Sequence, residues 1–229
     1  MEHGRRPRPR RSAERPCIRP PLSKGYLLGK EDRESIFVHP ENWYREHDVD
    51  LMTGTRVTAV DAHTRQVELT GGRRMSYTKL LLATGSSPRR LTVPGADVDK
   101  RCTSAAWETA SGSRPPSPPG ARIVVVGGGW IGLETAAAAR TAGALVTILE
   151  HSELPLLNVL GREAAEVFAD LHRDQGVVLR PHAAVERITG DGTRADGVQL
   201  ADGTRLPADA VVVGIGITPN VRLAEAAGL

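Results

Sequence analysis

The sequence predicts an α/β fold built around a doubly wound, mostly parallel sheet. A strand, a glycine-rich turn, a helix and a second strand follow one another over residues 123–149. Helical and strand-like segments then alternate as far as residue 213, which is typical of a parallel sheet covered by helices. The composition, with 40% hydrophobic and 25% charged residues among 229, is ordinary for a globular protein.

The first 18 residues are predicted to form a disordered, Arg/Pro-rich tail. Residues 1–19 hold seven arginines against two glutamates, whereas the whole chain has a formal net charge of only +3. Because this tail lacks interleaved aromatic residues and a reading helix, we do not expect a nucleic-acid partner. No apolar segment follows the tail as in a secretory signal, and no run approaches the roughly 20 apolar residues of a membrane span. We therefore expect a cytoplasmic protein without a membrane partner.

The segments between the tail and residue 120 predict a hairpin, one strand and a linker. Residues 56–60 and 66–69 alternate in polarity around a turn, as in an antiparallel hairpin. The apolar run at 79–83 predicts a buried strand. Four prolines within 111–120 exclude helix and strand interiors, so this stretch is predicted to be a linker.

The segments after the linker predict a strand at 123–126, a helix at 130–141, a strand at 145–149 and a helix at 161–175. Short strands are expected near residues 177–179, 185–188, 197–200 and 210–213.

Gly127, Gly129 and Gly132 form a Gly-x-Gly-x-x-Gly pattern directly after a predicted strand and directly before a predicted helix. The first glycine permits a tight turn, the second lets the backbone approach a pyrophosphate, and the third lets helix and strand pack closely. The next strand ends at Glu150, whose carboxylate would accept hydrogen bonds from the adenine ribose and repel a 2′-phosphate. The sequence thus predicts a Rossmann-like domain over 121–218 that favours NAD(H) over NADP(H); the alternative is a glycine turn that binds nothing.

Glu134 follows the third glycine by two residues and should lie near the mouth of this site; the alternative is a carboxylate that only stabilises the helix dipole. Lys24 is either a functional group or a solvated lysine in a proline-stiffened loop. No metal is predicted, because the seven histidines lack metal-ligand spacing. Cys17 and Cys102 lack the Cys-x-x-Cys spacing of a redox pair.

Four ordered motifs carry a resemblance to a known family. They are Arg-Pro-Pro-Leu-Ser-Lys-Gly-Tyr-Leu at 19–27, Leu-Leu-Leu-Ala-Thr-Gly-Ser-Ser-Pro-Arg at 80–89, Gly-Gly-Gly-Trp-Ile-Gly-Leu-Glu at 127–134 and Val-Gly-Ile-Gly-Ile-Thr-Pro-Asn at 213–220. Together they resemble the NADH-dependent, FAD-containing ferredoxin reductases.

The resemblance implies a flavin-binding domain into which an NAD-binding domain is inserted. NADH would pass a hydride to FAD, and single electrons would leave to a ferredoxin or rubredoxin-type iron–sulfur protein. Lys24 would lie beside the flavin ring, paired with Glu134. The remaining residues that the resemblance assigns are Arg19, Pro20, Val57, Ala83, Thr84, Gly85 and Arg89 for FAD, and Trp130, Ile131 and Gly216 for NADH.

The chain also departs from this family. Its members begin with their own glycine turn for FAD, which nothing before Arg19 resembles, and they continue past the Thr-Pro-Asn strand. Residues 19–110 are therefore predicted to be a partial FAD-binding domain, and 219–229 a truncated return into it.

Two functions stay open: an FAD-dependent NADH-to-ferredoxin oxidoreductase, or a truncated, non-catalytic NAD-binding fragment that does not retain FAD. Nitrite-reducing centres, oxygen and quinones are alternative electron acceptors, and the oligomeric state is open as well.

Overall fold

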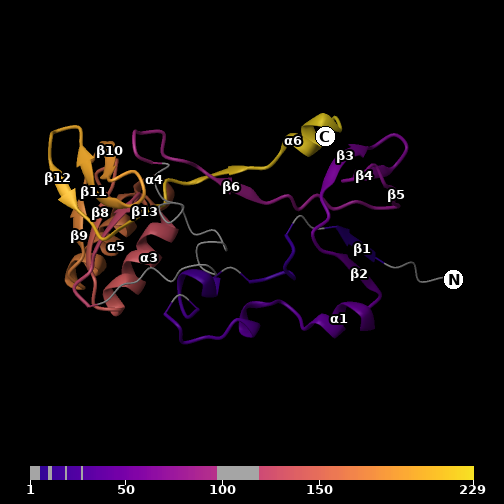
Figure 1. Ribbon diagram of the computed structural model, residues 1–229, viewed down its shortest axis with the longest axis horizontal. Coiled ribbons are helices and arrows are strands. Elements are labelled where there is room, and N and C mark those ends of the chain that lie inside the picture. The colour runs from indigo at the N-terminus through magenta and orange to yellow at the C-terminus, as the bar shows by residue number, and fades with distance from the viewer. Residues whose placement is uncertain (1–5, 10–11, 19, 27, 97–118) are drawn as a thin grey trace. The chain divides into compact units, whose positions relative to one another are not determined.

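The computed structural model describes residues 6–9, 12–18, 20–26, 28–96 and 119–229. These residues form two compact units, whose elements are labelled in Figure 1. The first unit takes its residues from Met1–Ile18, Arg33–Ser87 and Pro219–Leu229, and the second from Arg19–Asp32 and Pro88–Thr218.

The second unit is built on a four-stranded parallel sheet with the strand order β13-β7-β8-β9. Helix α3 (Trp130–Thr141) connects β7 to β8, and its alanine-rich sequence has high helix propensity. The predicted strand–turn–helix–strand run is confirmed. The strands of the sheet are β7 (Arg122–Val126), β8 (Leu145–Leu149), β9 (Val178–Arg180) and β13 (Ala210–Val213).

The central strand β7 is buried on both faces of this sheet. Ile123 and Val125 pack in one cluster with the apolar side chains of α3, whereas Val124 and Val126 pack on the opposite side with residues of β10 and β11. This division follows from the period-two alternation of side chains along a strand. Complete burial of each such side chain contributes about 1.5–3 kcal/mol, so β7 fixes the position of the turn that follows it.

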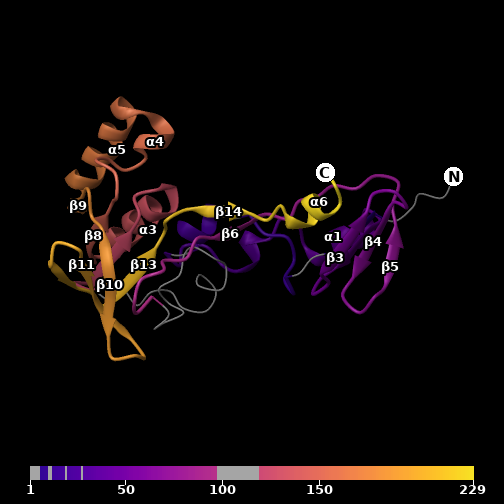
Figure 2. The ribbon, with the colours of Figure 1, turned by 90° about the horizontal axis from the view of Figure 1, so that it is seen from above.

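A three-stranded antiparallel sheet covers the face of the parallel sheet opposite α3. Its strands β10 and β11 run as a long hairpin (Figure 2). The α/β class is confirmed. Among the described residues, the strands on this face are antiparallel, because short turns join β10 to β11 and β11 to β12. The remaining elements of this unit are β10 (Val185–Gly190), β11 (Ala195–Leu200), β12 (Arg205–Pro207), α4 (Leu157–Leu160), α5 (Arg162–Asp174) and the 3₁₀ helix η1 (Pro20–Ser23).

The first unit holds a three-stranded antiparallel sheet, β3-β4-β5, and a parallel pair, β1-β2. The predicted hairpin is confirmed: Val60 pairs with Val67, and the Asp61 carboxylate accepts hydrogen bonds from the turn amides of His63 and Thr64. Leu223 packs on the core of this sheet. The elements are β1 (Arg6–Pro9), β2 (Val49–Met52), β3 (Val57–Asp61), β4 (Gln66–Leu69), β5 (Arg74–Ser76), α1 (Glu41–Glu46), η2 (Glu34–Ile36) and α6 (Arg222–Ala226).

The chain passes between the units through β6 (Ser86–Pro88) and β14 (Ile217–Pro219), which pair as a two-stranded sheet. In the second unit the Arg89 amide donates to the Gly216 carbonyl oxygen over 2.9 Å. In the first unit the Asn220 amide donates to the Gly85 carbonyl oxygen, also over 2.9 Å. No helix among the described residues is long and apolar enough to cross a membrane.

The structure differs from the sequence-based expectation at the start of the chain. Residues 6–9 form β1, parallel to β2, and the Ile18 amide donates to the Ile36 carbonyl oxygen over 2.8 Å. The prediction of a disordered tail is therefore wrong for residues 6–9 and 12–18. Proline is tolerated in a strand that pairs on one edge only, which composition alone does not reveal.

The buried strand predicted at 79–83 is wrong. These residues form no strand, and Leu81 is 87% exposed. The apolar run has no hydrogen-bonding neighbour strand among the described residues, and an isolated strand is not stable in water. The predicted linker at 111–120 lies outside the described residues except for its last two positions.

Candidate functional site: the glycine turn of the second unit

The turn between β7 and α3 is a close fit of backbone against backbone. Gly127 has a φ of +103°, and a Cβ on it would lie 2.5 Å from the Gly214 carbonyl oxygen. A Cβ on Gly132 would overlap the Gly127 carbonyl oxygen. The Gly127 amide donates to the Leu149 carbonyl oxygen over 2.8 Å, which ties the turn to β8. Two of the three glycines are therefore required by the fold itself.

Gly129 is different, because no described residue crowds it. It caps α3 with a φ of −77°, which other residues adopt readily, and the nearest atom to an added Cβ is the Gly214 carbonyl oxygen at 3.9 Å. The backbone here borders open space at the N-terminus of a 12-residue helix, whose first amides have no partner within the helix. Such a position suits an anion, because the amides donate hydrogen bonds and the helix dipole is positive there.

Trp130 and Ile131 form the first turn of α3, and both side chains are partly exposed at 46% and 39%. The Trp130 ring contacts Phe168 of α5 edge to face, with ring centroids 5.4 Å apart. The predicted NADH residues Trp130, Ile131 and the three glycines therefore share one turn, and Gly216, with a φ of +105°, follows the neighbouring strand β13.

Glu150 follows β8 and holds the backbone around the glycine turn. Its Oε2 accepts a hydrogen bond from the Gly128 amide over 2.6 Å, and its Oε1 accepts one from the Ser152 amide over 2.8 Å. A carboxylate has about four lone-pair sites, so each oxygen keeps one for a further donor. Glu150 is thus beside the turn, as the spacing predicts, and already orients it without a ligand.

The loop after Glu150 closes over the middle of the glycine turn. Pro155 lies beside Gly128, and the Leu156 amide donates to the Gly128 carbonyl oxygen over 3.2 Å. Glu153 anchors this loop through a two-point ion pair with Arg162 at 2.6 and 2.9 Å. The Arg162 guanidinium lowers the pKa of the Glu153 carboxyl, so the pair stays charged at neutral pH.

Lys24 and Glu134 form an ion pair within the second unit. The Lys24 Nζ lies 2.6 Å from the Glu134 Oε1, and the two side chains are 54% and 30% exposed. Glu134 is in the second turn of α3, and Lys24 follows η1, whose turn is held by amide bonds from Lys24 and Tyr26 to the Pro21 carbonyl oxygen. The structure therefore joins a lysine and a glutamate that are 110 residues apart in the sequence.

The residues assigned to FAD are divided between the units. Pro20 and Arg89 belong to the second unit, and Arg19 lies outside the described residues. Val57, Ala83, Thr84 and Gly85 belong to the first, where the Thr84 hydroxyl donates to the Asn220 carbonyl oxygen over 2.6 Å. Neither unit by itself brings all of these residues together, so no step through a flavin is derived from their geometry.

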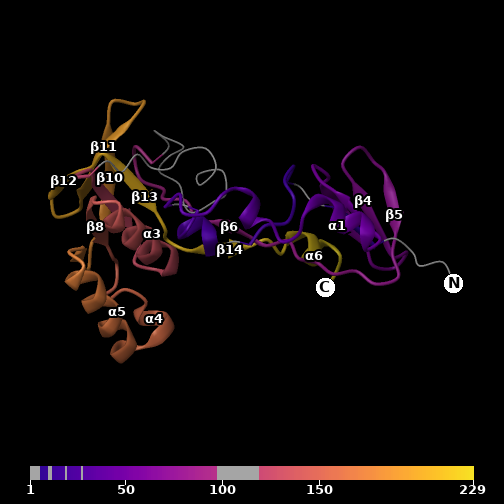
Figure 3. The same ribbon diagram turned by 90° about the horizontal axis from the view of Figure 1, so that it is seen from below.

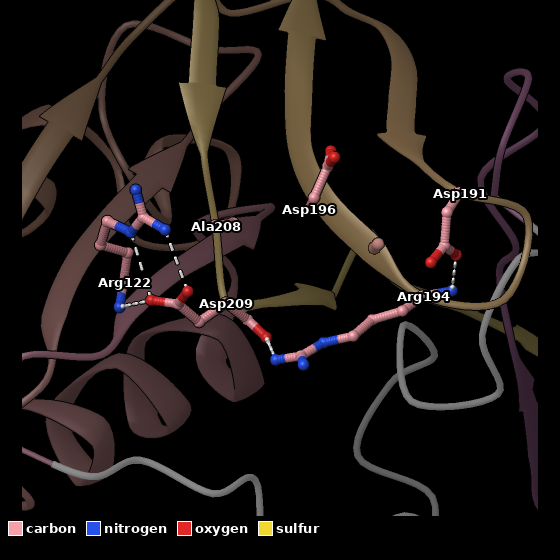
Figure 4. Close-up of a pocket in the computed structure, with 7 residues that line it drawn as sticks. Arg122, Asp191, Arg194, Asp196, Ala208 and Asp209 are labelled. Atoms are coloured by element: carbon pink, nitrogen blue, oxygen red, sulfur yellow. Dashed lines mark hydrogen bonds and ion pairs between the residues drawn. The ribbon is translucent and has the colours of Figure 1, made fainter.

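A cavity of about 240 Å³ lies at the other end of the parallel sheet (Figure 4). Arg122 starts β7 and forms a two-point ion pair with Asp209, which precedes β13. Hydrogen bonding to Arg122 lowers the Asp209 pKa to about 2. Because dinucleotides bind at the carboxyl ends of parallel strands, this cavity at their amino ends is separate from the candidate site.

Two residues near these sites were not singled out from the sequence. His172 of α5 is buried and lies between two backbone carbonyls, and Asn220 holds the segment 84–87 through both its backbone and its side chain. The helical spacing of Ala165, Ala169 and His172 on the buried side of α5 is a signal that could have found the histidine.

Residues 11–229 match the model of one protein family, described as pyridine nucleotide-disulphide oxidoreductase. The match covers more than half of the chain. The chain belongs to the pyridine nucleotide-disulphide oxidoreductase family. The predicted relationship to its ferredoxin reductases is confirmed by relatives. Rhodocoxin reductase of Rhodococcus erythropolis is 39% identical over 93% of this chain, and putidaredoxin reductase of Pseudomonas putida is 40% identical over 92%.

Solved structures of this family agree with that relationship. The putidaredoxin reductase chain of a covalent complex with putidaredoxin matches 96% of this chain, with a TM-score of 0.90 and 37% identity. A ferredoxin reductase from Rhodopseudomonas palustris matches 99%, with a TM-score of 0.91 and 35% identity. The chain spans about half the length of its relatives: 50% of rhodocoxin reductase and 51% of putidaredoxin reductase.

Proposed function

We propose that the second unit binds NADH at the glycine turn, with the pyrophosphate at the N-terminus of α3 and the adenine ribose at Glu150. The observation that carries this proposal is the contrast between the glycines. A Cβ on Gly127 or Gly132 would clash with neighbouring backbone atoms, whereas Gly129 borders open space at a helix N-terminus. The Glu150 carboxylate beside this turn would repel a 2′-phosphate, so NADH is favoured over NADPH.

The wider proposal is an oxidoreductase in which NADH reduces FAD, and FAD reduces a ferredoxin or rubredoxin-type iron–sulfur protein. Bound FAD would supply the conversion of a hydride into single electrons. The relatives named as rhodocoxin and putidaredoxin reductases support this proposal. The Lys24–Glu134 ion pair supports it as well, because it places a cation next to an anion of α3. A cytoplasmic location is part of the same proposal.

The residues proposed to line FAD are Arg19, Pro20, Val57, Ala83, Thr84, Gly85 and Arg89. Those proposed to contact NADH are Gly127, Gly129, Trp130, Ile131, Gly132, Glu150 and Gly216.

A second candidate function is NADH binding without retained flavin. It is favoured by the exposure of Leu80 and Leu81, which precede the FAD-assigned residues 83–85 and form no strand. This candidate keeps the nucleotide site of the second unit and assigns no electron transfer to the first. Oxygen, quinones or a nitrite-reducing centre are alternative acceptors if flavin is retained.

One experiment separates the two candidates. The purified chain is incubated with excess FAD, desalted, and its visible absorption is recorded before and after anaerobic addition of NADH. Flavin that stays bound and loses its absorption with NADH supports the reductase; addition of oxidised ferredoxin should then restore the absorption. A colourless protein that binds NADH in calorimetry supports the second candidate, and a protein that binds neither contradicts both.

A further inference from the structure

A buried histidine lies behind the proposed nucleotide site. His172 carries a polar side chain and is only 8% exposed. Burial of a polar group costs free energy unless it is hydrogen-bonded, and a leucine or phenylalanine would fill the same space without that cost. The contacts of the two ring nitrogens are therefore the feature that distinguishes His172 from an apolar residue at this position.

Both ring nitrogens of His172 face backbone carbonyls. Nδ1 lies 2.9 Å from the Phe168 carbonyl oxygen, one turn earlier in α5, and Nε2 lies 3.2 Å from the Leu133 carbonyl oxygen in α3. A carbonyl oxygen only accepts hydrogen bonds, so a contact is a hydrogen bond where that nitrogen carries a hydrogen, and a neutral imidazole carries one N–H. The Nδ1 contact is local to α5, whereas the Nε2 contact joins α5 to α3, its neighbour in Figure 3.

The two carbonyls belong to residues that continue directly into the proposed site. The Phe168 ring packs edge to face on Trp130, which is the first residue of α3. The Leu133 carbonyl is in the peptide group that leads into Glu134, the partner of Lys24. The Leu133 amide donates to the Gly129 carbonyl oxygen over 2.9 Å, so this residue also closes the first turn after the glycine.

We propose that His172 is a positioning residue for the nucleotide site: its Nε2–H holds the Leu133 carbonyl and thereby fixes the first turns of α3. This inference rests on the proposed function, since it concerns binding of NADH at those turns. His172 does not touch the ligand. It holds the first amides of α3, the Trp130 ring and the Glu134 carboxylate in the positions that bind NADH. Binding then costs less conformational entropy, because these groups are already ordered.

A set of three variants isolates the hydrogen bond between the helices. His172→Gln places an amide N–H near the position of Nε2 and can still reach Leu133. His172→Asn places it near Nδ1 and can reach only Phe168. His172→Phe keeps a ring and removes both nitrogens, and Arg173→Gln changes the exposed neighbour on α5 as the control. Loss of one hydrogen bond of ordinary strength predicts about fivefold weaker NADH binding.

The measurements are NADH affinity by calorimetry and deuterium uptake of residues 130–135 in the free protein. Weaker binding and faster uptake in the Asn and Phe variants, with the Gln and control variants close to wild type, support the proposal. Equal affinities in all variants, or rescue by Asn as good as by Gln, overturn it. If the wild type itself binds no NADH, only the proposed function is refuted. The deuterium uptake then still tests whether His172 fixes the first turns of α3. Faster uptake in the Asn and Phe variants than in the Gln and control variants supports this, and unchanged uptake refutes it.

Discussion

Replacing Gly129 and Gly132 separately by alanine tests the glycine turn, because the two positions have opposite surroundings. At Gly132 the new methyl group overlaps the Gly127 carbonyl oxygen and lies 3.2 Å from its carbon, and neither is a flexible side chain. Overpacking of this kind costs about 3 kcal/mol. Alanine recovers about 1 kcal/mol through helix propensity, so Gly132→Ala should lower the free energy of unfolding by about 2 kcal/mol.

At Gly129 the same methyl group meets open space, and the backbone conformation suits alanine. The loss of the glycine cap costs about 1 kcal/mol or less. The methyl group would nevertheless stand where the pyrophosphate approaches, and loss of one or two charge-assisted hydrogen bonds predicts NADH affinity lower by about tenfold to a hundredfold.

The assay is thermal unfolding together with calorimetric titration of NADH. Gly132→Ala should melt about 4–8 °C below wild type, since about 1 kcal/mol shifts Tm by about 2–4 °C in a chain of this size. Gly129→Ala should melt within about 4 °C of wild type and bind NADH poorly. A Gly129→Ala protein with unchanged affinity would refute the placement of the pyrophosphate, and a Gly132→Ala protein with unchanged Tm would refute the close packing.

Glu150→Arg should shift the preference from NADH toward NADPH by at least about tenfold, because it replaces repulsion of the 2′-phosphate by attraction; an unchanged ratio of the two affinities refutes that role. Lys24→Ala should slow flavin reduction by NADH in stopped-flow absorbance more than it weakens NADH binding, with Lys30→Ala, an exposed lysine of the same segment, as the control. Arg122 lowers the Asp209 pKa from 3.8 to about 2, so the ionised Asp209 stabilises the fold above pH 3.8. This stabilisation is lost as the pH falls toward 2 and the carboxylate is protonated. Arg122→Gln should raise the Asp209 pKa in a carbon-13 NMR titration and flatten the loss of stability over that range; an unshifted titration contradicts the assignment.

Elements encoded by neighbouring residues could be predicted from the sequence. The strand before Gly127, the helix from Trp130 to Thr141 and the hairpin around Asp61 all follow from local periodicity and turn residues, and the structure places them where expected. The position of Glu150 beside the glycine turn follows from the length of the same βαβ unit.

Features that depend on distant partners could not be predicted in this way. The apolar run at 79–83 predicts a buried strand, yet whether a strand forms depends on a neighbour that supplies its hydrogen bonds. The arginines and prolines of 6–9 predict disorder, but pairing with β2 overrides composition. The role proposed for His172 depends on a carbonyl 39 residues away, which no local pattern contains.

The interleaving of the two units couples their folding. Leu223 packs on Leu69 and its neighbours in the first unit, although the residues from 88 to 218 of the second unit lie between them in the chain. Closing an unstructured loop of that length costs about 4 kcal/mol of chain entropy. Once the second unit folds, Arg89 is hydrogen-bonded to Gly216, and the loop shrinks to a short junction. If the proposed nucleotide stabilises the second unit, it would therefore also favour packing of α6 on its sheet, although it touches neither.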